Sequence, residues 1–191
     1  MVLSDKLPAF SSSFTPRRPR QLAIIGGRLE ADNRAVFDAL KQKSQGRIAV
    51  FATASEIPDE VGGETVEDFT RYGFEAELIP LFHNNSHQAA FDEALIARVQ
   101  RLGSVYFTGG DQARIIKALL GENGAGTPML EVLQHLHAQG GLVAGSSAGA
   151  AMMPERIILR GTSLEALVDG INDGDGAVAD DDHPRGLILG P

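Results

Sequence analysis

Five short apolar runs constrain the fold of this chain more than any other feature of its sequence. The runs are LAIIGG (22–27), RIAVFATAS (47–55), FEAELIPLF (74–82), SVYFTGG (104–110) and GGLVAGSS (140–147). Segments of helical period lie between them, at 31–43, 64–72, 88–101, 112–121 and 127–139. Strands that alternate with helices of roughly ten to fifteen residues predict βαβ units, and strands that are apolar throughout predict a sheet covered on both faces. We therefore expect an α/β fold with a doubly wound, mostly parallel sheet.

The domain organisation predicted from the sequence is simple. Residues 1–19 are rich in Ser, Pro and Arg and lack apolar periodicity, so we expect a flexible N-terminal arm. We expect Arg17, Arg18 and the adjoining Arg20 to be solvated rather than to form a binding patch. The remaining residues, 20–191, have the length of one α/β domain. The arm has no continuous apolar core of the kind a secretory signal carries, which predicts a cytoplasmic location.

Composition excludes several classes of function. The chain has 17 Lys and Arg against 25 Asp and Glu, a formal charge of -8, which argues against a partner made of nucleic acid. Such a charge suits a cationic substrate, although solubility alone also explains it. Cysteine is absent, which excludes disulfides, thiolate metal sites and a cysteine nucleophile. No apolar stretch approaches the ~18 residues of a membrane span, so no membrane partner is expected.

Unusual residues follow four of the five apolar runs, in IIGGRLE, FATASEIP, FTGGDQ and AGSSAGA. In open α/β sheets, ligands bind at the carboxyl ends of the strands, which is where these segments lie. Glycine at such positions lets backbone N–H groups approach a ligand closely. A single turn of this kind is commonly no more than a tight βα connection. Four at one sheet edge predict a functional site.

The segment Gly145–Gly149 matches the pattern G-x-S-x-G, with Ser147 at its centre. In that motif a sharp turn between a strand and a helix exposes the serine hydroxyl above the sheet, and the flanking glycines avoid collisions. GLVA before the motif is strand-like, and AGAAMM after it is compatible with a helix. The pattern therefore predicts a nucleophile elbow, but a serine hydroxyl also needs a base and an orienting acid.

Four segments together resemble the peptidase family that contains cyanophycinase and the aspartyl dipeptidases. They are IIGG (24–27), AVFATAS (49–55), YFTGGDQ (106–112) and AGSSAGAAMMP (144–154). Gln112 and the Ala-Ala-Met-Met-Pro tail are closer to the cyanophycinase branch. The resemblance implies a three-layer sheet of the flavodoxin-like or class I glutamine amidotransferase-like kind, a serine peptidase activity, and neither cofactor nor metal. A homodimer is an expectation by resemblance only.

The resemblance also assigns roles to individual residues. Ser147 is the implied nucleophile, with the backbone N–H groups of Gly109, Gly110 and Ala148 as donors to the oxyanion. Asp111 and Gln112 lie at the same strand end, where Gln112 would bind the substrate. The implied charge-relay acid is Glu165, 18 residues after Ser147, with Asp169 as a weaker competitor.

The family's histidine lies in a segment that this sequence does not contain. His83 and His87 are expected in a loop, and His135 and His137, two apart on a helix, face different directions. Only His183 follows Ser147, 36 residues on, in an acidic context unlike that of the family. Three explanations stay open: the sequence is a fragment, a second chain supplies the missing strands, or hydrolysis has been lost. We favour the first, and so expect a domain incomplete at its C-terminus, because an open sheet edge would otherwise remain.

The acidic stretch DGINDGDGAVADDDHP (169–184) is reminiscent of calcium loops but lacks the required spacing of ligands, so we interpret it as a flexible acidic loop. Its charge would attract an arginine-bearing polymer.

The function implied is a serine exopeptidase that hydrolyses the β-linked aspartyl-arginine polymer cyanophycin to β-Asp-Arg dipeptides. The alternatives are an aspartyl dipeptidase acting on short peptides and a non-catalytic peptide-binding protein that lacks the base. A nucleotide-binding protein is disfavoured because IIGGRLEADN after the first strand lacks G-x-G-x-x-G.

Overall fold

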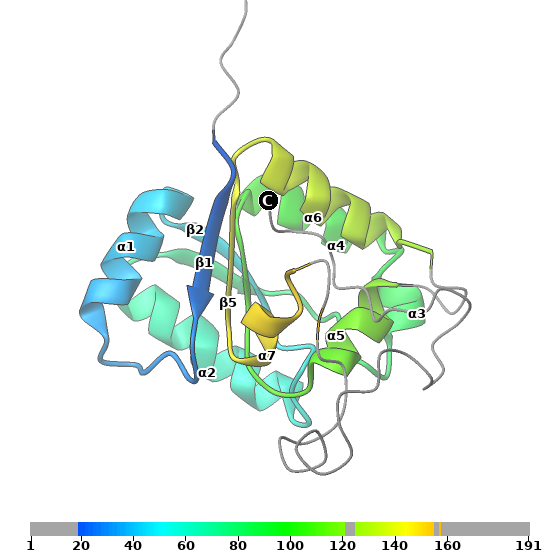
Figure 1. Cartoon of the computed structure of the whole chain (residues 1–191), viewed down its shortest axis with the longest axis horizontal. Helices are drawn as coiled ribbons and strands as arrows, with labels where there is room; N and C mark the ends of the chain where they lie inside the picture. The colour runs from blue at the N-terminus through cyan, green and yellow to red at the C-terminus, as the bar shows by residue number, and fades with distance from the viewer. Residues whose placement is uncertain (1–18, 121–124, 155–156, 158–191) are drawn as a thin grey trace, which may run out of the picture.

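The computed structural model describes residues 19–120, 125–154 and 157, which form five parallel strands with helices on both faces (Figure 1). The strands are β1 (Gln21–Ile25), β2 (Arg47–Phe51), β3 (Glu75–Leu78), β4 (Val105–Phe107) and β5 (Leu142–Ser146). They lie in the order β1-β5-β4-β2-β3, and every pair is parallel. The predicted doubly wound α/β sheet is thereby confirmed.

The helices divide between the two faces of the sheet. One face carries α1 (Arg34–Ser44) and α2 (Pro58–Arg71). The other carries α4 (Glu93–Leu102), α5 (Gln112–Leu119), α6 (Pro128–Ala138) and the short α7 (Ala148–Ala151), with α3 (Ser86–Ala89) beside α5 (Figure 1). The connections through α1 and α2 run toward the β3 edge and the later ones run back. Right-handed crossovers require this change of face.

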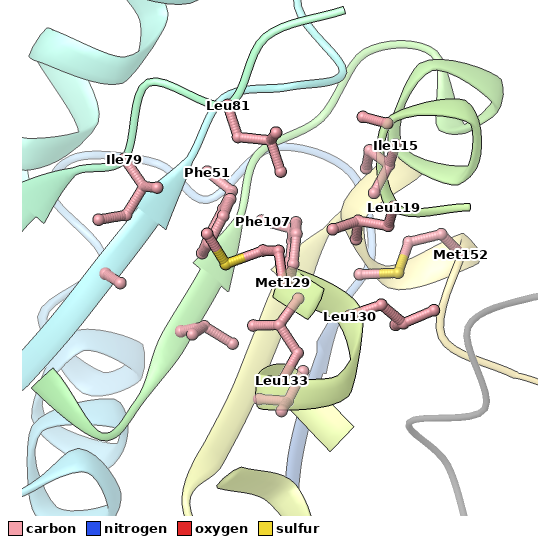
Figure 2. Close-up of a cluster of buried hydrophobic side chains, with 14 of the residues drawn as sticks. Phe51, Ile79, Leu81, Phe107, Ile115, Leu119, Met129, Leu130, Leu133 and Met152 are labelled. Carbon is pink, nitrogen blue, oxygen red and sulfur yellow. The ribbon is translucent and has the colours of Figure 1, made fainter. Parts of the chain in front are cut away.

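Each inner strand contributes to two separate cores because successive side chains point to opposite faces. On β2, Ile48 and Val50 pack beneath α1 and α2, whereas Ala49 and Phe51 pack beneath the other helices. Figure 2 shows the second core, where the stacked rings of Phe51 and Phe107 meet aliphatic and methionine side chains from the covering helices. Burial on both faces explains why these strands are apolar throughout.

Local signals fix most helix ends. Asp92, Asp111 and Thr127 each accept a hydrogen bond from the backbone at the start of α4, α5 and α6. Such caps satisfy N–H groups that have no partner within the helix. Gly103 ends α4 in the left-handed conformation that glycine adopts without strain.

Four predicted elements differ from the structure in their bounds. The helix predicted at 64–72 begins at Pro58, and its Gly62 is a packing residue, since a Cβ there would lie 2.5 Å from Leu78 Cδ1. The segment 88–101 is divided between α3 and α4 because Asp92 caps a new helix, and His87 lies in α3 rather than in a loop. The runs 47–55 and 74–82 form shorter strands whose last residues belong to the following loops.

Among the described strands, β1 and β3 are the edges of the sheet. Ile24 on β1 is 69% exposed. Of the arm predicted at residues 1–19, residues 1–18 fall outside the described residues, as does the acidic stretch 169–184. Within the described part, none of the helices has the length and apolar character needed to cross a membrane.

Candidate active site

The candidate site lies where neighbouring strands direct the chain to opposite faces of the sheet. From β1 the chain continues toward α1, whereas from the adjacent β5 it continues into α7 on the other face. In open α/β sheets this divergence creates the crevice in which ligands bind. A cavity of about 310 Å³ occupies it, lined by the loops after β1, β4 and β5 and by one side of α2. Ser147 is among its lining residues.

Ser147 has a strained backbone at the turn between β5 and α7. Its φ is 49° and its ψ is -117°, values typical of glycine at the first central position of a type II′ turn. Gln45 also has a positive φ, but it lies in the ordinary left-handed region at a helix end. The Ser147 N–H donates to the carbonyl of Ile25 at 3.0 Å, and its carbonyl accepts from Ala150 and Ala151. These bonds hold an exposed residue between buried neighbours.

The two glycines of the motif make this turn possible. A Cβ on Gly145 would lie 2.5 Å from the carbonyl oxygen of Gly149. A Cβ on Gly149 would overlap the carbonyl oxygen of Phe107 in β4. The chain therefore folds back so closely that no side chain fits at either position. The predicted elbow geometry, with Ser147 at its tip, is present.

Gly109, at the end of β4, lies directly against Ser147. A Cβ on Gly109 would be 3.1 Å from Ser147 Cβ and 3.7 Å from its hydroxyl oxygen. Gly110 has a φ of 139°, and a side chain there would overlap the carbonyl of Ala54. Within the described residues, no acceptor takes the N–H of Gly109, Gly110 or Ala148. These three N–H groups thus have no acceptor among the described residues, and their role as oxyanion donors stays a prediction.

Asp111 and Gln112 follow the end of β4, as Gly109 and Gly110 do, but differ in their surroundings. The Asp111 carboxylate caps α5 by accepting from the N–H of Ala113 at 2.8 Å, and its own N–H donates to Ala54 at 2.9 Å. These contacts give Asp111 a structural function. Gln112, half-buried, is the first residue of α5. Its predicted contact with a substrate stays a prediction.

Tyr106 and Ser146 form a buried polar pair in the wall of the cavity. The Tyr106 hydroxyl donates to Ser146 Oγ at 2.9 Å, and both residues are less than 5% exposed. Burial raises the pKa of the Tyr106 phenol, so it is neutral at physiological pH. The bond fixes the last residue of β5, directly before Ser147. Sequence analysis missed this pair because it depends on the register in which Tyr106 lies opposite Ala144.

Three charged residues of the cavity were also missed. Glu64 and Asp68 come from α2, and Arg28 from the loop after β1. Arg28 Nη2 lies 3.9 Å from the Glu64 carboxylate, while Asp68 pairs with Arg71 at 2.8 Å. The carboxylates are four residues apart and so face the same side of the helix. Helical spacing was the available signal, because the predicted helix at 64–72 contains both carboxylates, but the sequence does not show that this side of the helix faces the cavity.

The histidines of the described part lie away from Ser147. His135 and His137 are at the end of α6, by the amino ends of the strands, so the length of β5, about 16 Å, separates them from the elbow. His87 lies in α3, which packs beside α5, and neither His83 nor His87 lines the cavity that contains Ser147. His183, Glu165 and Asp169 lie outside the described residues.

A second cavity, of about 420 Å³, lies at the opposite end of the sheet among α1, α4 and α6. It is larger, but Gln45, its one non-glycine lining residue with a positive φ, has the ordinary left-handed conformation of a helix end, and the cavity lies at the amino ends of the strands. Ligand sites of open α/β sheets occur at the carboxyl ends, so the smaller cavity is the candidate site.

Comparison with known proteins agrees with this geometry. Residues 22–169 match the model of Peptidase family S51. A cyanophycinase of Synechococcus elongatus is 33% identical over 170 residues, which cover 87% of this chain and 51% of that protein. A cyanophycinase of Trichormus variabilis is 30% identical over 131 residues, covering 66% of this chain and 42% of the relative. The chain thus spans about half the length of these relatives. It belongs to Peptidase family S51.

Proposed function

We propose that this chain carries the nucleophile of a serine peptidase of the cyanophycinase type, and that Ser147 is that nucleophile. The observation that carries the proposal is the conformation of Ser147, an exposed residue held at φ 49° and ψ -117° beside unoccupied backbone donors. Strained backbone of this kind occurs at functional sites, where the surrounding structure maintains it. Membership of Peptidase family S51 supports the same assignment.

In the proposed reaction, Ser147 Oγ attacks the carbonyl carbon of the scissile amide while its proton passes to a general base. The carbonyl oxygen becomes an oxyanion, and in this proposal the N–H groups of Gly109 and Ala148 donate to it. Collapse of this intermediate expels the amine, which takes the proton from the base, and leaves an acyl-enzyme on Ser147. Water then attacks the ester, and the base again transfers the proton.

The proposal requires a base and a relay acid from outside the described residues. Glu165 is our candidate acid. The general base is either His183, the one histidine that follows Ser147 in this sequence, or a histidine that this sequence does not contain. A carboxylate that orients the imidazole and stabilises its protonated form would complete the triad.

The proposed substrate is cyanophycin, cleaved to β-Asp-Arg dipeptides. Two relatives named cyanophycinase, at 33% and 30% identity, support this choice. An acidic cavity wall also suits a polymer that bears arginine. Action on short aspartyl peptides is the competing substrate choice, and comparing products from the polymer and from Asp-X dipeptides separates the two.

The test is covalent labelling with a fluorophosphonate followed by peptide mapping. We expect the adduct on Ser147, none on the adjacent buried Ser146, and none in the Ser147→Ala variant. Incubation of cyanophycin with the wild-type protein should release β-Asp-Arg, and incubation with the Ser147→Ala variant should not. Labelling of another residue, or release of β-Asp-Arg that persists in the Ser147→Ala variant, would refute the nucleophile assignment. A correctly folded protein that neither reacts with the label nor cleaves the polymer would instead lack an activating base and act as a binding protein.

A further inference from the structure

Tyr106 carries a hydroxyl that the packing of its ring does not require. The ring lies in the core beneath α1 and α2, edge to face with Phe69 at a centroid distance of 5.0 Å. A phenylalanine ring would fill the same volume. The hydroxyl donates to Ser146 Oγ at 2.9 Å, and no other described residue bonds to that oxygen. Replacing both partners of a buried pair by apolar groups of the same shape costs little, so stability alone does not explain the pair.

The bond holds Ser146 from the face of the sheet opposite to the one toward which the chain turns. The Ser146 side chain lies on the α1 and α2 face, as do Leu142 and Ala144 of the same strand, because alternate residues of a strand share a face. Ser147 then leads the chain into α7 on the other face. Tyr106 therefore restrains the last residue of β5 on one side while α7 departs on the other.

The strain at Ser147 gives this restraint a consequence. A backbone at φ 49° and ψ -117° costs about 1–3 kcal/mol and persists only where the surroundings prevent its relaxation. The Ser147 hydroxyl bonds to no described residue, so its own side chain does not hold the turn. Relaxation requires a rotation about φ, which displaces either α7 or the peptide that joins Ser147 to Ser146. The Tyr106 bond opposes displacement of that peptide, as does the 3.0 Å bond from the Ser147 N–H to Ile25.

We propose that Tyr106 is a positioning residue for the nucleophile, which fixes Ser146 and thereby maintains the strained backbone of Ser147. Tyr106 is 3% exposed and its hydroxyl contacts Ser146 rather than Ser147, so it is not a catalytic residue. The inference rests on the proposed function in taking Ser147 as the nucleophile. Displacement of a reacting group by about 1 Å can slow a reaction by roughly 10²-fold. Loss of the Tyr106 hydroxyl should therefore slow the chemistry of Ser147 by more than the loss of stability explains.

The first experiment compares the rates of fluorophosphonate labelling at Ser147, at a temperature at which every variant is fully folded. Tyr106→Phe should be labelled at least about tenfold more slowly than the wild-type protein. Thr127→Val is the matched control, because it removes a buried hydroxyl that donates to Leu119 at 2.9 Å and does not line the cavity. It should be labelled at the wild-type rate. Tyr106→Phe/Ser146→Ala leaves no buried hydroxyl without a partner, so it should regain stability relative to Tyr106→Phe and still be labelled slowly.

The second experiment measures hydrogen exchange of the Ser147 amide, which does not depend on activity. This N–H donates to the Ile25 carbonyl, so its exchange reports local opening of the turn. Tyr106→Phe should exchange the amide about tenfold faster than the wild-type protein, because the turn opens more often when Ser146 is free. Thr127→Val should leave the exchange of this amide unchanged.

Failure of this inference can be distinguished from failure of the proposed function. A wild-type labelling rate in folded Tyr106→Phe, or a rate that recovers together with stability in the double variant, would overturn the positioning role and leave the peptidase assignment intact. If Tyr106→Phe does not fold, Ser146→Ala, which removes the acceptor of the same bond, takes its place. A wild-type protein that is not labelled lacks an activating base, and amide exchange then decides alone: faster exchange in Tyr106→Phe supports the positioning role, and unchanged exchange overturns it.

Discussion

Ser147→Gly is expected to stabilise the protein relative to Ser147→Ala. At φ 49° and ψ -117° a Cβ is strained, whereas glycine adopts these angles without a steric penalty. Alanine keeps the Cβ and removes only the hydroxyl. The Ser147 hydroxyl makes no hydrogen bond with any described residue, so its loss alone should change stability little.

The expected magnitude follows from two opposing effects. Backbone strain of this kind costs about 1–3 kcal/mol. Glycine increases the conformational entropy of the unfolded chain, which offsets roughly 0.5–1 kcal/mol of the gain. The free energy of unfolding should therefore be about 0.5–2 kcal/mol higher for the glycine variant than for the alanine variant. For a domain of this size that corresponds to a rise in Tm of roughly 2–6 °C.

Thermal and urea unfolding followed by circular dichroism would measure this difference. Ala39→Gly is the matched control, because Ala39 is exposed within α1 and glycine there should destabilise by about 1 kcal/mol. If the control behaves as expected but the glycine variant at 147 is no more stable than the alanine variant, the backbone at Ser147 is not strained and the elbow argument fails.

Four further substitutions test the packing and titration of the described residues. Gly149→Ala should lower the free energy of unfolding by about 3 kcal/mol or more, because the added Cβ would overlap backbone atoms. Gly63→Ala, where the added Cβ meets open space, should raise the free energy of unfolding by about 0.5–1 kcal/mol, and urea unfolding measures both values. Tyr106→Phe removes the bond to Ser146 and should lose about 1–2 kcal/mol at pH 7. Burial raises the pKa of Tyr106, so the stability that depends on its neutral phenol is complete below about pH 10 and is lost as pH rises through the raised pKa. The free energy of unfolding of the wild-type protein should therefore fall between pH 9 and 11 by an amount that Tyr106→Phe does not show. Burial, aided by the charge of an arginine, lowers the pKa of His137 from its ordinary 6.5. The stability that depends on neutral His137 is therefore complete above pH 6.5 and is lost as pH falls through the lowered pKa. His137→Leu should gain more stability at pH 5 than at pH 7 in urea unfolding.

The sequence predicted the sheet well because its signals are local. Strands buried on both faces must be apolar along their length, and the five runs satisfied this requirement. The elbow was predictable for a similar reason, since a turn in which Gly145 and Gly149 approach other backbone atoms admits no other residue. The residues that define each strand and the elbow lie within a few positions of one another in the sequence.

The rest of the site depends on how distant segments pack. Gly62 and Gly63 interrupted the apolar pattern of α2, and its true start at Pro58 emerges only when Gly62 is seen against Leu78 of β3. That packing sets which side of α2 faces the cavity. The strand order, which places β1 beside β5 and so brings Arg28 near the nucleophile, is likewise a property of the whole sheet.

The contacts of the nucleophile within the described residues allow its geometry to be separated from its activation. The bond from Ser147 to Ile25 and the close approach of Gly149 to Phe107 hold the elbow without any contribution from an acid or a base. A serine hydroxyl in this position is nevertheless a weak nucleophile at neutral pH until a base removes its proton. Oxyanion donors and binding alone leave only about 10³–10⁴-fold acceleration over water. Substituting the residue that supplies the base should therefore leave the shape and stability of the elbow unchanged. The rate of fluorophosphonate labelling at Ser147 and the pH dependence of that rate should change with the substitution.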